Sequence, residues 1–322
     1  MRALITGATG FVGGHLAEAL RRQGDEVTAL ARSAHKAAAL APLGVRVVPG
    51  DLHDRAALQR AVEGQDVIYH VAGIVAGRNE AHFLEANRDG TRNLVEVAEG
   101  VGAGRFVLVS SLAAAGPTVK GRPLTGDEPP SPVTAYGRSK LAAEQVVTAS
   151  RLAWTILRPP MVYGPRDLEV LKVFRLARLG IAPVLGDGTQ ELSAVHGADL
   201  AEALIAAGTS DTALRRAYFP CHPEIFTGAD MVREIGRAMG RSPALIRVPS
   251  PIGRGVLMVT EAAARLAGRT TILTADKANE FFQPAWTGDP DQLTRDTGWH
   301  AARDLRTGLE ETYQWYRTAG WL

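Results

Sequence analysis

A tyrosine and a lysine four residues apart, Tyr136 and Lys140, have the residue types and spacing for proton transfer. They lie in a stretch with helical periodicity, and residues four apart on a helix share a face. A phenol has a pKa of about 10, and a neighbouring ammonium group lowers that pKa by favouring the phenolate. This spacing often arises by chance, so the meaning of the pair depends on its surroundings.

Two hydroxyls precede this pair, Ser110 and Ser111, at the end of a predicted strand over residues 105–110. In an open α/β sheet, side chains at the carboxyl end of a strand face the ligand crevice. The two hydroxyls could bond the backbone of the turn, or either could orient a substrate carbonyl. A polar, proline-rich stretch, residues 118–132, then predicts a loop near the mouth of the site.

The start of the chain predicts the fold that positions these side chains. Residues 2–5 predict a buried strand, Gly7, Gly10 and Gly13 follow at three-residue spacing, and residues 11–22 are apolar at helical spacing. This is the opening of a dinucleotide-binding βαβ unit. The glycines permit a tight turn, close approach of a pyrophosphate and close helix packing, while the helix N-terminus attracts the anion. A glycine-rich turn without a ligand is the alternative.

The end of the second predicted strand, residues 26–30, indicates which dinucleotide binds. An acid there would accept a hydrogen bond from the ribose 2′-hydroxyl of NAD. The sequence instead has Ala31 and Arg32, with His35 and Lys36 close behind. A guanidinium without an acid favours a 2′-phosphate, so we expect NADP(H) to be preferred and NAD(H) to remain possible. Stacking of Arg32 on adenine, or its exposure to water, is the alternative.

A third predicted strand, residues 45–48, ends at Asp51, which could reach the adenine amino group or cap the helix that begins near Asp54. Further strands are expected at 66–70 and 154–157, and residues 71–73 form a small-residue turn beneath the cofactor path. Alternating strands and helices predict an α/β protein with a doubly wound parallel sheet.

The regular alternation fades after residue 165. We expect a helix at 168–180, a loop at 181–190, and strands at 191–195 and 216–219. His196 has no obvious partner and is interpreted as structural, with Asp199 placed to bond it or to cap the helix over residues 200–207. The predicted domains are a dinucleotide-binding domain of residues 1–165, to which 191–219 return, and a substrate lobe of residues 166–190 and 220–322.

Composition excludes several classes of protein. The 322 residues carry a net charge of +2 without a basic block, which gives no reason to expect nucleic acid. The single cysteine, Cys221, rules out a disulfide framework or a multi-thiolate metal site within one chain, and no metal is expected. With a strand beginning at residue 2 and no long apolar run, we expect no signal peptide, no membrane partner and a cytoplasmic protein.

The motifs together resemble the extended short-chain dehydrogenase/reductase superfamily, also described as the NAD-dependent epimerase/dehydratase family. The motifs occur in the family's order and extend over the whole chain. The ordered set is therefore much more specific than any single motif. The matching stretches are residues 6–13, 50–52, 87–91, 110–111, 136–140, 158–165, 196–199, 298–299 and 315–316. The resemblance implies a Rossmann-type sheet of about seven strands, a smaller and mostly helical C-terminal lobe, and a homodimer formed through a four-helix bundle that includes the Tyr136 helix.

The resemblance also implies a mechanism in which hydride passes between nicotinamide C4 and a substrate carbon. Tyr136 would exchange the proton at the adjacent oxygen, and Lys140 would lower the tyrosine pKa and hold the ribose hydroxyls. Ser111 would hydrogen-bond the reacting oxygen, with Ser110 in its place if the register shifts by one. The predicted cofactor-binding residues are Gly7, Thr9, Gly10, Phe11, Val12, Gly13, Arg32, Asp51, Leu52, Ala72, Gly73, Asn87, Ser110, Tyr136, Lys140, Pro159 and Val162. The predicted substrate-binding residues are Ala113, Met161 and Tyr163.

The sequence indicates the substrate class less clearly than the fold. Nucleotide-sugar epimerases and dehydratases usually have asparagine where this chain has Met161, and often Arg-x-Phe where it has residues 192–194. Residues 158–167 are instead similar to the hydroxysteroid-dehydrogenase and dihydroflavonol-reductase-like branches, which implies an alcohol/ketone pair in an apolar substrate. Met161 and residues 256–258 would suit such a pocket. A nucleotide-sugar epimerase or dehydratase with tightly bound NAD(P) is the alternative, and retention of Tyr136 and Lys140 argues against a non-catalytic nicotinamide sensor.

Overall fold

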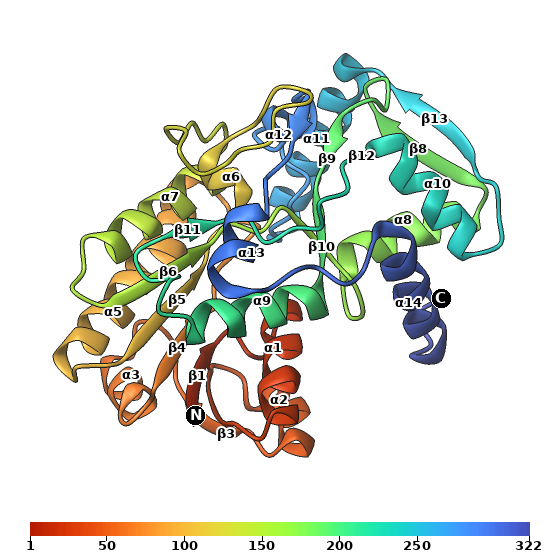
Figure 1. Ribbon diagram of the computed structural model, residues 1–322. Helices are drawn as coiled ribbons and strands as arrows, with labels where there is room; N and C mark the ends of the chain where they lie inside the picture. Colours follow the sequence, from red (N-terminus) through yellow and green to blue (C-terminus); the bar gives the residue numbers. More distant parts are fainter.

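A seven-stranded parallel sheet forms the centre of the computed structural model, which describes all 322 residues (Figure 1). Its order is β11-β6-β5-β4-β1-β2-β3, so the chain reverses direction across the sheet between β1 and β4. Ligands of such sheets bind at this reversal, beyond the carboxyl ends of the strands. The predicted Rossmann-type fold is thus confirmed. The strands are β1 (Arg2–Thr6), β2 (Glu26–Ala31), β3 (Arg46–Pro49), β4 (Val67–His70), β5 (Arg105–Val109), β6 (Ala153–Leu157) and β11 (Ala217–Tyr218).

Helices cover both faces of the sheet because successive strand residues point to opposite sides. Ile5 packs with α1 (Phe11–Arg22) and α9 (Gly197–Thr209), whereas its neighbour Leu4 packs with α3 (Arg55–Val62), α5 (Gly90–Gly100) and α7 (Ala135–Thr148). The short helical segments between them are α2 (Ala34–Ala37), η1 (Ala38–Leu43), α4 (Glu80–Phe83), η2 (Leu84–Asp89) and α6 (Leu112–Ala115).

The remaining elements form a smaller lobe beside the carboxyl edge of the sheet. Its core packs α8 (Leu168–Arg178), α10 (Gly228–Ala238) and α14 (Leu305–Thr318) around Phe174, Ile235 and Leu309. Its short strands pair as β10-β7, β12-β9-β14 and β13-β8. These strands are β7 (Met161–Tyr163), β8 (Ile181–Leu185), β9 (Glu191–Leu192), β10 (Ala194–His196), β12 (Phe226–Thr227), β13 (Ala244–Val248) and β14 (Ala285–Trp286).

Two predicted elements are wrong. Residues 181–190 contain β8 rather than a loop alone, because β8 finds a parallel partner in β13 about sixty residues later. The strand predicted at 191–195 is two strands, since β9 pairs with β12 and β14 whereas β10 pairs with β7. The break falls at Ser193, whose hydroxyl accepts a hydrogen bond from the Gly288 N–H at 3.3 Å.

The C-terminal segment contacts both halves of the molecule. α11 (Ser250–Leu266) and α12 (Ala278–Phe281) belong to the lobe, whereas α13 (Asp291–Thr297) packs on α9 of the dinucleotide-binding half (Figure 1). Leu293 and Trp299 are buried in the same apolar cluster as Ile5. The Trp299 indole donates a hydrogen bond to the Asp199 carbonyl at 3.1 Å. None of the helices combines the length and apolar character needed to cross a membrane.

Candidate active site

Ser111, Tyr136 and Lys140 are brought together where β5 ends against the start of α7. Thr134 caps α7 by accepting a hydrogen bond from the Gly137 N–H at 3.1 Å, so Tyr136 lies in the first turn. Ser111 caps α6, and its hydroxyl lies near enough to the phenol of Tyr136 to affect its pKa. Burial raises the pKa of Tyr136 to about 12, although the neighbouring Ser111 hydroxyl acts in the opposite direction. Without a cofactor, this phenol is therefore protonated at neutral pH.

Lys140 lies one turn further along α7 and is buried. Its ammonium donates a 2.6 Å hydrogen bond to the carbonyl of Val109. Burial lowers the pKa of Lys140 to about 8, partly opposed by the nearby Glu144 carboxylate. The structure therefore does not show the expected lowering of the Tyr136 pKa by this ammonium. A Cβ on Gly73 would lie 3.5 Å from the Lys140 nitrogen, so the lysine faces the turn after β4.

Ser110 points away from Ser111, into a buried ion pair that sequence reasoning missed. Its hydroxyl donates to Glu144, and Arg158 binds the same carboxylate through Nε at 3.0 Å and Nη2 at 2.7 Å. Both partners of this pair are buried. Ser110 thus binds Glu144 in the second half of α7, whereas Ser111 supplies the hydroxyl beside Tyr136. The one sequence feature that could have indicated this ion pair is Glu144, which lies one turn after Lys140 on the same face of the predicted helix.

The glycine turn fits a dinucleotide pyrophosphate. A Cβ on Gly13 would lie 2.2 Å from the Gly7 carbonyl oxygen, and one on Gly7, at a φ of 81°, would lie 2.7 Å from the Ala72 nitrogen. No side chain caps the N-terminus of α1, where Gly10 is the capping residue. The N–H groups of the first turn are therefore left for an anion. Thr9 and Gly10 are exposed, whereas Phe11 and Val12 are half-buried.

Arg32 and Asp51 follow neighbouring strands beside this turn. Arg32 is exposed just beyond Ala31, which is paired in register with Pro49 of β3. Asp51 accepts hydrogen bonds through Oδ1 from the N–H groups of His53 at 2.8 Å and Asp54 at 3.1 Å. Asp54, and not Asp51, caps α3.

Asn87 is buried and holds the turn that follows β4. Its side chain exchanges hydrogen bonds with the backbone of Ile74, at 2.8 and 3.1 Å, and donates to Ser139 at 2.9 Å. It therefore holds the turn that contains the half-buried Ala72 and the exposed Gly73. The side chain of Leu52 packs against the first residue of α5, because a Cβ on Gly90 would lie only 2.9 Å from it.

The remaining predicted residues lie at the boundary with the lobe. The Pro159 carbonyl accepts from the Leu112 N–H at 2.9 Å, and half-buried Val162 packs against the apolar cluster beneath α1. Ala113 is buried against α7, and Met161 is half-buried beside the lobe core.

Tyr163 was predicted to bind substrate, but it lies within the lobe core with 2% of its surface exposed. Its phenol donates to the Asp304 carbonyl at 3.1 Å. His196 caps α9 by accepting from the Ala198 N–H at 3.3 Å, and burial lowers the pKa of this histidine to about 3. The expected bond from Asp199 to His196 is absent, because Asp199 pairs with Arg303.

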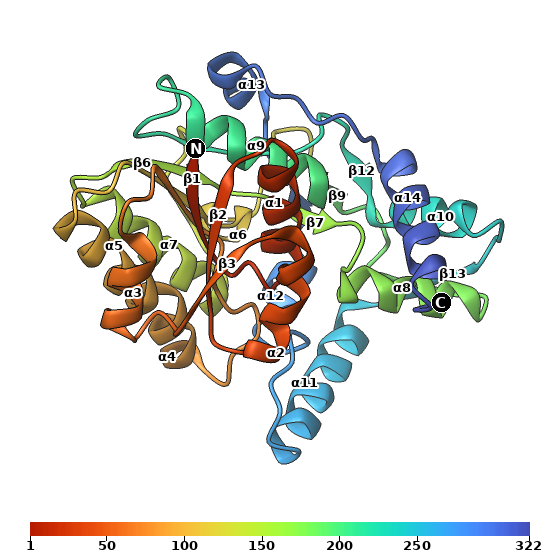
Figure 2. The same cartoon turned by 90° about the horizontal axis from the view of Figure 1, so that it is seen from below.

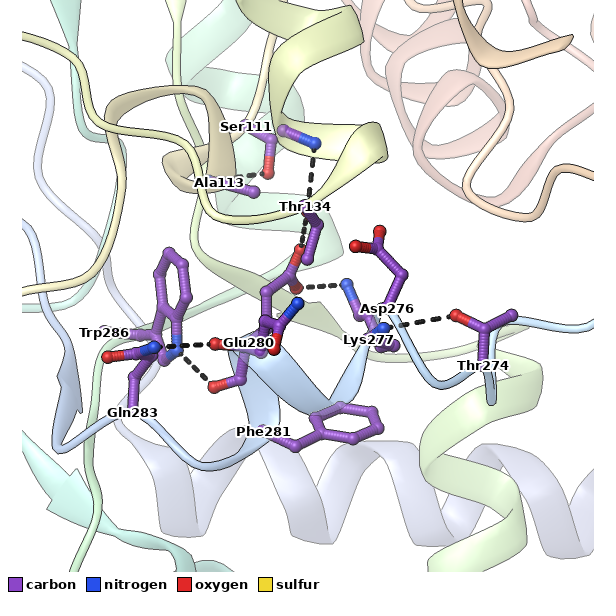
Figure 3. A network of polar contacts seen from close by, with 12 residues as sticks. Ser111, Ala113, Thr134, Thr274, Asp276, Lys277, Glu280, Phe281, Gln283 and Trp286 are labelled. Atoms are coloured by element: carbon purple, nitrogen blue, oxygen red, sulfur yellow. Dashed lines mark hydrogen bonds and ion pairs between the residues drawn. The ribbon is translucent and has the colours of Figure 1, made fainter. Parts of the chain in front are cut away.

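A polar cluster at the start of α12, residues 276–280, contacts the beginning of α7, and sequence reasoning missed it (Figure 3). The Lys277 ammonium lies 5.3 Å from the centroid of the Tyr136 ring and pairs with Glu280. Glu280 also accepts a 2.6 Å hydrogen bond from Thr134. The Asp276 carboxylate accepts from the N–H of Ala135 at 2.9 Å. This cluster lies about 140 residues along the chain from Tyr136, and no local pattern reveals such a contact.

Comparisons with known proteins identify the family of this chain. A family model described as the NAD dependent epimerase/dehydratase family matches residues 3–218. The ceramide reductase of Caulobacter vibrioides is 35% identical over 322 residues, covering 99% of this chain and 95% of that protein. The 2-alkyl-3-oxoalkanoate reductase of Stenotrophomonas maltophilia is 31% identical over 259 residues, covering 74% of this chain and 76% of that protein.

A solved structure with the same fold is the UDP-glucose 4-epimerase of Thermus thermophilus in complex with NAD. It is 24% identical, with a TM-score of 0.81, and the match covers 99% of this chain and 100% of that one. Family and relatives together indicate an NAD-dependent enzyme of the epimerase, dehydratase or reductase type. This chain therefore belongs to the NAD dependent epimerase/dehydratase family.

Proposed function

We propose that the protein reduces a ketone on an apolar, long-chain substrate and prefers NADPH as the hydride source. The observation that carries the proposal is that Ser111 lies near Tyr136 just beyond β5, with the buried Lys140 one turn further along α7 and bonded to the last residue of β5, Val109. A bound nicotinamide would supply the hydride. The raised pKa of Tyr136 keeps its proton in place for transfer to the developing alkoxide.

Each neighbouring side chain has a separate task in this proposal. Ser111 holds the carbonyl oxygen near the phenol by a hydrogen bond. Lys140 faces Gly73 and would hold the ribose hydroxyls, exchanging its bond to Val109 for them. A cationic Lys140 then stabilises the phenolate that proton transfer leaves behind.

An apolar side chain at the boundary with the lobe, Met161, supports an apolar substrate. Met161 stands where a sugar site usually has asparagine, and it packs with other apolar side chains. The two reductases among the relatives are named for a ceramide and a 2-alkyl-3-oxoalkanoate, both of which carry alkyl chains. We infer a ketone close to an alkyl chain as the substrate class.

The NADPH preference is supported by Arg32, which is exposed at the end of β2 beside the glycine turn. We expect Arg32→Asp to weaken NADPH binding by about ten- to a hundredfold, since a charge-assisted bond to the 2′-phosphate contributes about 1.5–3 kcal/mol. NADH binding should be unchanged or stronger. Fluorescence titration with both nucleotides measures this, and equal losses for the two would contradict the preference.

Turnover of long-chain ketones with each nicotinamide tests the proposed reaction. We expect Tyr136→Phe to slow reduction by at least about a hundredfold, because it removes the general acid. NADPH affinity should stay within a few fold of the unmodified protein. Unchanged turnover would overturn the role of Tyr136. Tightly bound nicotinamide in the purified protein, with thermal stabilisation by a UDP-sugar, would favour the epimerase alternative.

We also propose a homodimer formed through α5 and α7. These helices pack side by side on one face of the sheet, and Glu96 of α5 and Gln145 of α7 are among their exposed residues. Light scattering on the purified protein should give twice the 34.3 kDa mass of one chain.

A further inference from the structure

α11 projects from the body of the molecule (Figure 2), and several of its apolar side chains are exposed. Of its 17 residues, only Gly253 and Leu257 are buried. Ile252 is 60% exposed, Val256 57%, Val259 70% and Leu266 90%. Steps of four, three and seven residues place these four side chains on one stripe of the helix. We call them the α11 stripe.

The opposite face of α11 attaches the helix to the protein. A Cβ on Gly253 would lie 2.6 Å from the ring of Phe282, and the Arg254 guanidinium lies 5.4 Å from the centroid of that ring. The Glu261 carboxylate accepts from the N–H of Ala275 at 2.8 Å. Because these contacts all involve the opposite face of α11, the stripe faces outward.

The segment that carries the stripe has a net positive charge. Residues 244–271 contain four arginines, Arg247, Arg254, Arg265 and Arg269, and Glu261 is their only acid. That carboxylate is already bound by Arg265 at 2.7 Å and by the backbone of Ala275. Four arginines against one glutamate give this segment a net positive charge, in a chain whose total is only +2. Its natural complement is a negatively charged surface.

We propose that α11 docks on a lipid bilayer that contains anionic headgroups and lies in the plane of the interface. An exposed apolar stripe on a helix whose polar face carries arginines is the pattern of helices that bind in this way. The helix is about 25 Å long, which suits lying along the surface. A second copy of the chain fits less well, because its own arginines would meet those of the first.

Docking would bring the active site to the lipid. Glu261 holds Ala275, two residues before Lys277, whose ammonium covers Tyr136. The stripe and the polar cluster over Tyr136 therefore belong to one connected segment. The sequence predicted no membrane partner because nothing in it is long enough to span a bilayer, whereas peripheral docking needs only one exposed face. The docking proposal rests on α11 alone and is independent of the proposed reduction.

Vesicle flotation with the full chain tests the proposal. We expect the protein to float with vesicles that mix phosphatidylcholine and phosphatidylglycerol, to bind weakly to phosphatidylcholine alone, and to be released by salt. The double variant V256E/V259E should lose at least tenfold in the bound-to-free ratio. Replacing both Arg265 and Arg269 by glutamine should weaken binding by about fivefold for each arginine removed.

The matched control is Leu168→Glu, which places the same charge on a residue of α8 that is 59% exposed. It should float like the unmodified protein, and circular dichroism should be unchanged in all variants. Failure of the unmodified protein to bind mixed vesicles, or equal binding by V256E/V259E, would overturn the proposal. A smaller assembly for V256E/V259E than for the unmodified protein without lipid would overturn it too, since the stripe would then join copies of the chain.

Discussion

Tyr136 lies beside two charges of opposite sign that both belong to the α12 segment. The Lys277 ammonium lies over its ring, an arrangement that attracts the cation to the aromatic face. The Glu280 carboxylate is near enough to raise the pKa of the phenol. Glu280 therefore helps to keep the proton on Tyr136, which the proposed role of this residue as proton donor requires.

We expect Glu280→Gln to lower the pKa of Tyr136, because it removes a negative charge and leaves Lys277 uncompensated. Alcohol oxidation with NADP⁺ needs the phenolate, so its rate rises with pH through this pKa. The rising limb should therefore move to lower pH in the variant. The pH profile of kcat/KM measures the shift in the free enzyme. Glutamine can still accept the hydrogen bond from Thr134, and a uniform loss of rate with an unmoved limb would show a purely structural role.

The buried pair of Glu144 and Arg158 should be costly to break from one side. Arg158→Met leaves an uncompensated buried carboxylate, and we expect the free energy of unfolding to fall by about 3–5 kcal/mol. Replacing both partners by methionine should restore part of that loss. Urea denaturation measures each change. The control is Arg138→Met, whose exposed partner is Glu80, and its cost should be below about 1 kcal/mol.

At the level of elements, the approach of α1 to β1 depends on one missing side chain. Gly13 faces the Gly7 carbonyl at a distance that admits no Cβ, whereas a Cβ on the adjacent Gly14 would meet its nearest atom at 3.5 Å. Two neighbouring glycines of one helix therefore have different physical reasons to be there. Gly13 sets the shape of the glycine turn, and Gly14 does not.

We expect Gly13→Ala to destabilise the protein by about 1–3 kcal/mol through overpacking and to weaken nucleotide binding at least tenfold. Gly14→Ala should instead be neutral or stabilising by up to about 1 kcal/mol, because alanine is the better helix former. Thermal unfolding and nucleotide titration of both variants measure the contrast. Similar effects at the two positions would contradict the packing argument.

Elements with local partners were readable from the sequence, and those with distant partners were not. β1, α1 and β2 follow one another within about thirty residues, and their periodicity is local. β8 was missed because its sequence contains Pro183 and its partner β13 lies far along the chain. The side chains of Ser110 and Ser111 point in opposite directions, and only the register of β5 decides which one meets Tyr136. Lys277 and Glu280 reach the site through tertiary packing alone.

For the whole molecule, three buried histidines link stability to acidity. Burial lowers the pKa of His70 to about 3, of His196 to about 3 and of His15 to about 4. An unfolded histidine has a pKa of about 6.5. Between these values the unfolded chain binds more protons than the native protein, so the free energy of unfolding decreases as the pH falls.

We expect stability to decline from about pH 6.5 downwards, by up to about 1.4 kcal/mol per pH unit for each buried histidine. His70 hydrogen-bonds Thr6 and Thr91, so His70→Asn should lower stability at neutral pH but flatten this decline. Urea denaturation at several pH values measures the slope. The exposed His35→Asn should leave it unchanged, and an unaltered slope in His70→Asn would show that carboxylates alone cause the acid sensitivity.

The packing of Leu293 and Trp299 in the same apolar cluster as the first strand also affects how the chain folds during its synthesis. On the ribosome, the glycine turn and its strand emerge first, but the apolar cluster that buries Ile5 lacks two members until residue 299 has been synthesised. The edge strand β11 arrives about sixty residues after its neighbour β6. The face of the sheet that α9 covers therefore stays partly exposed on the nascent chain until residues 293–299 have been synthesised.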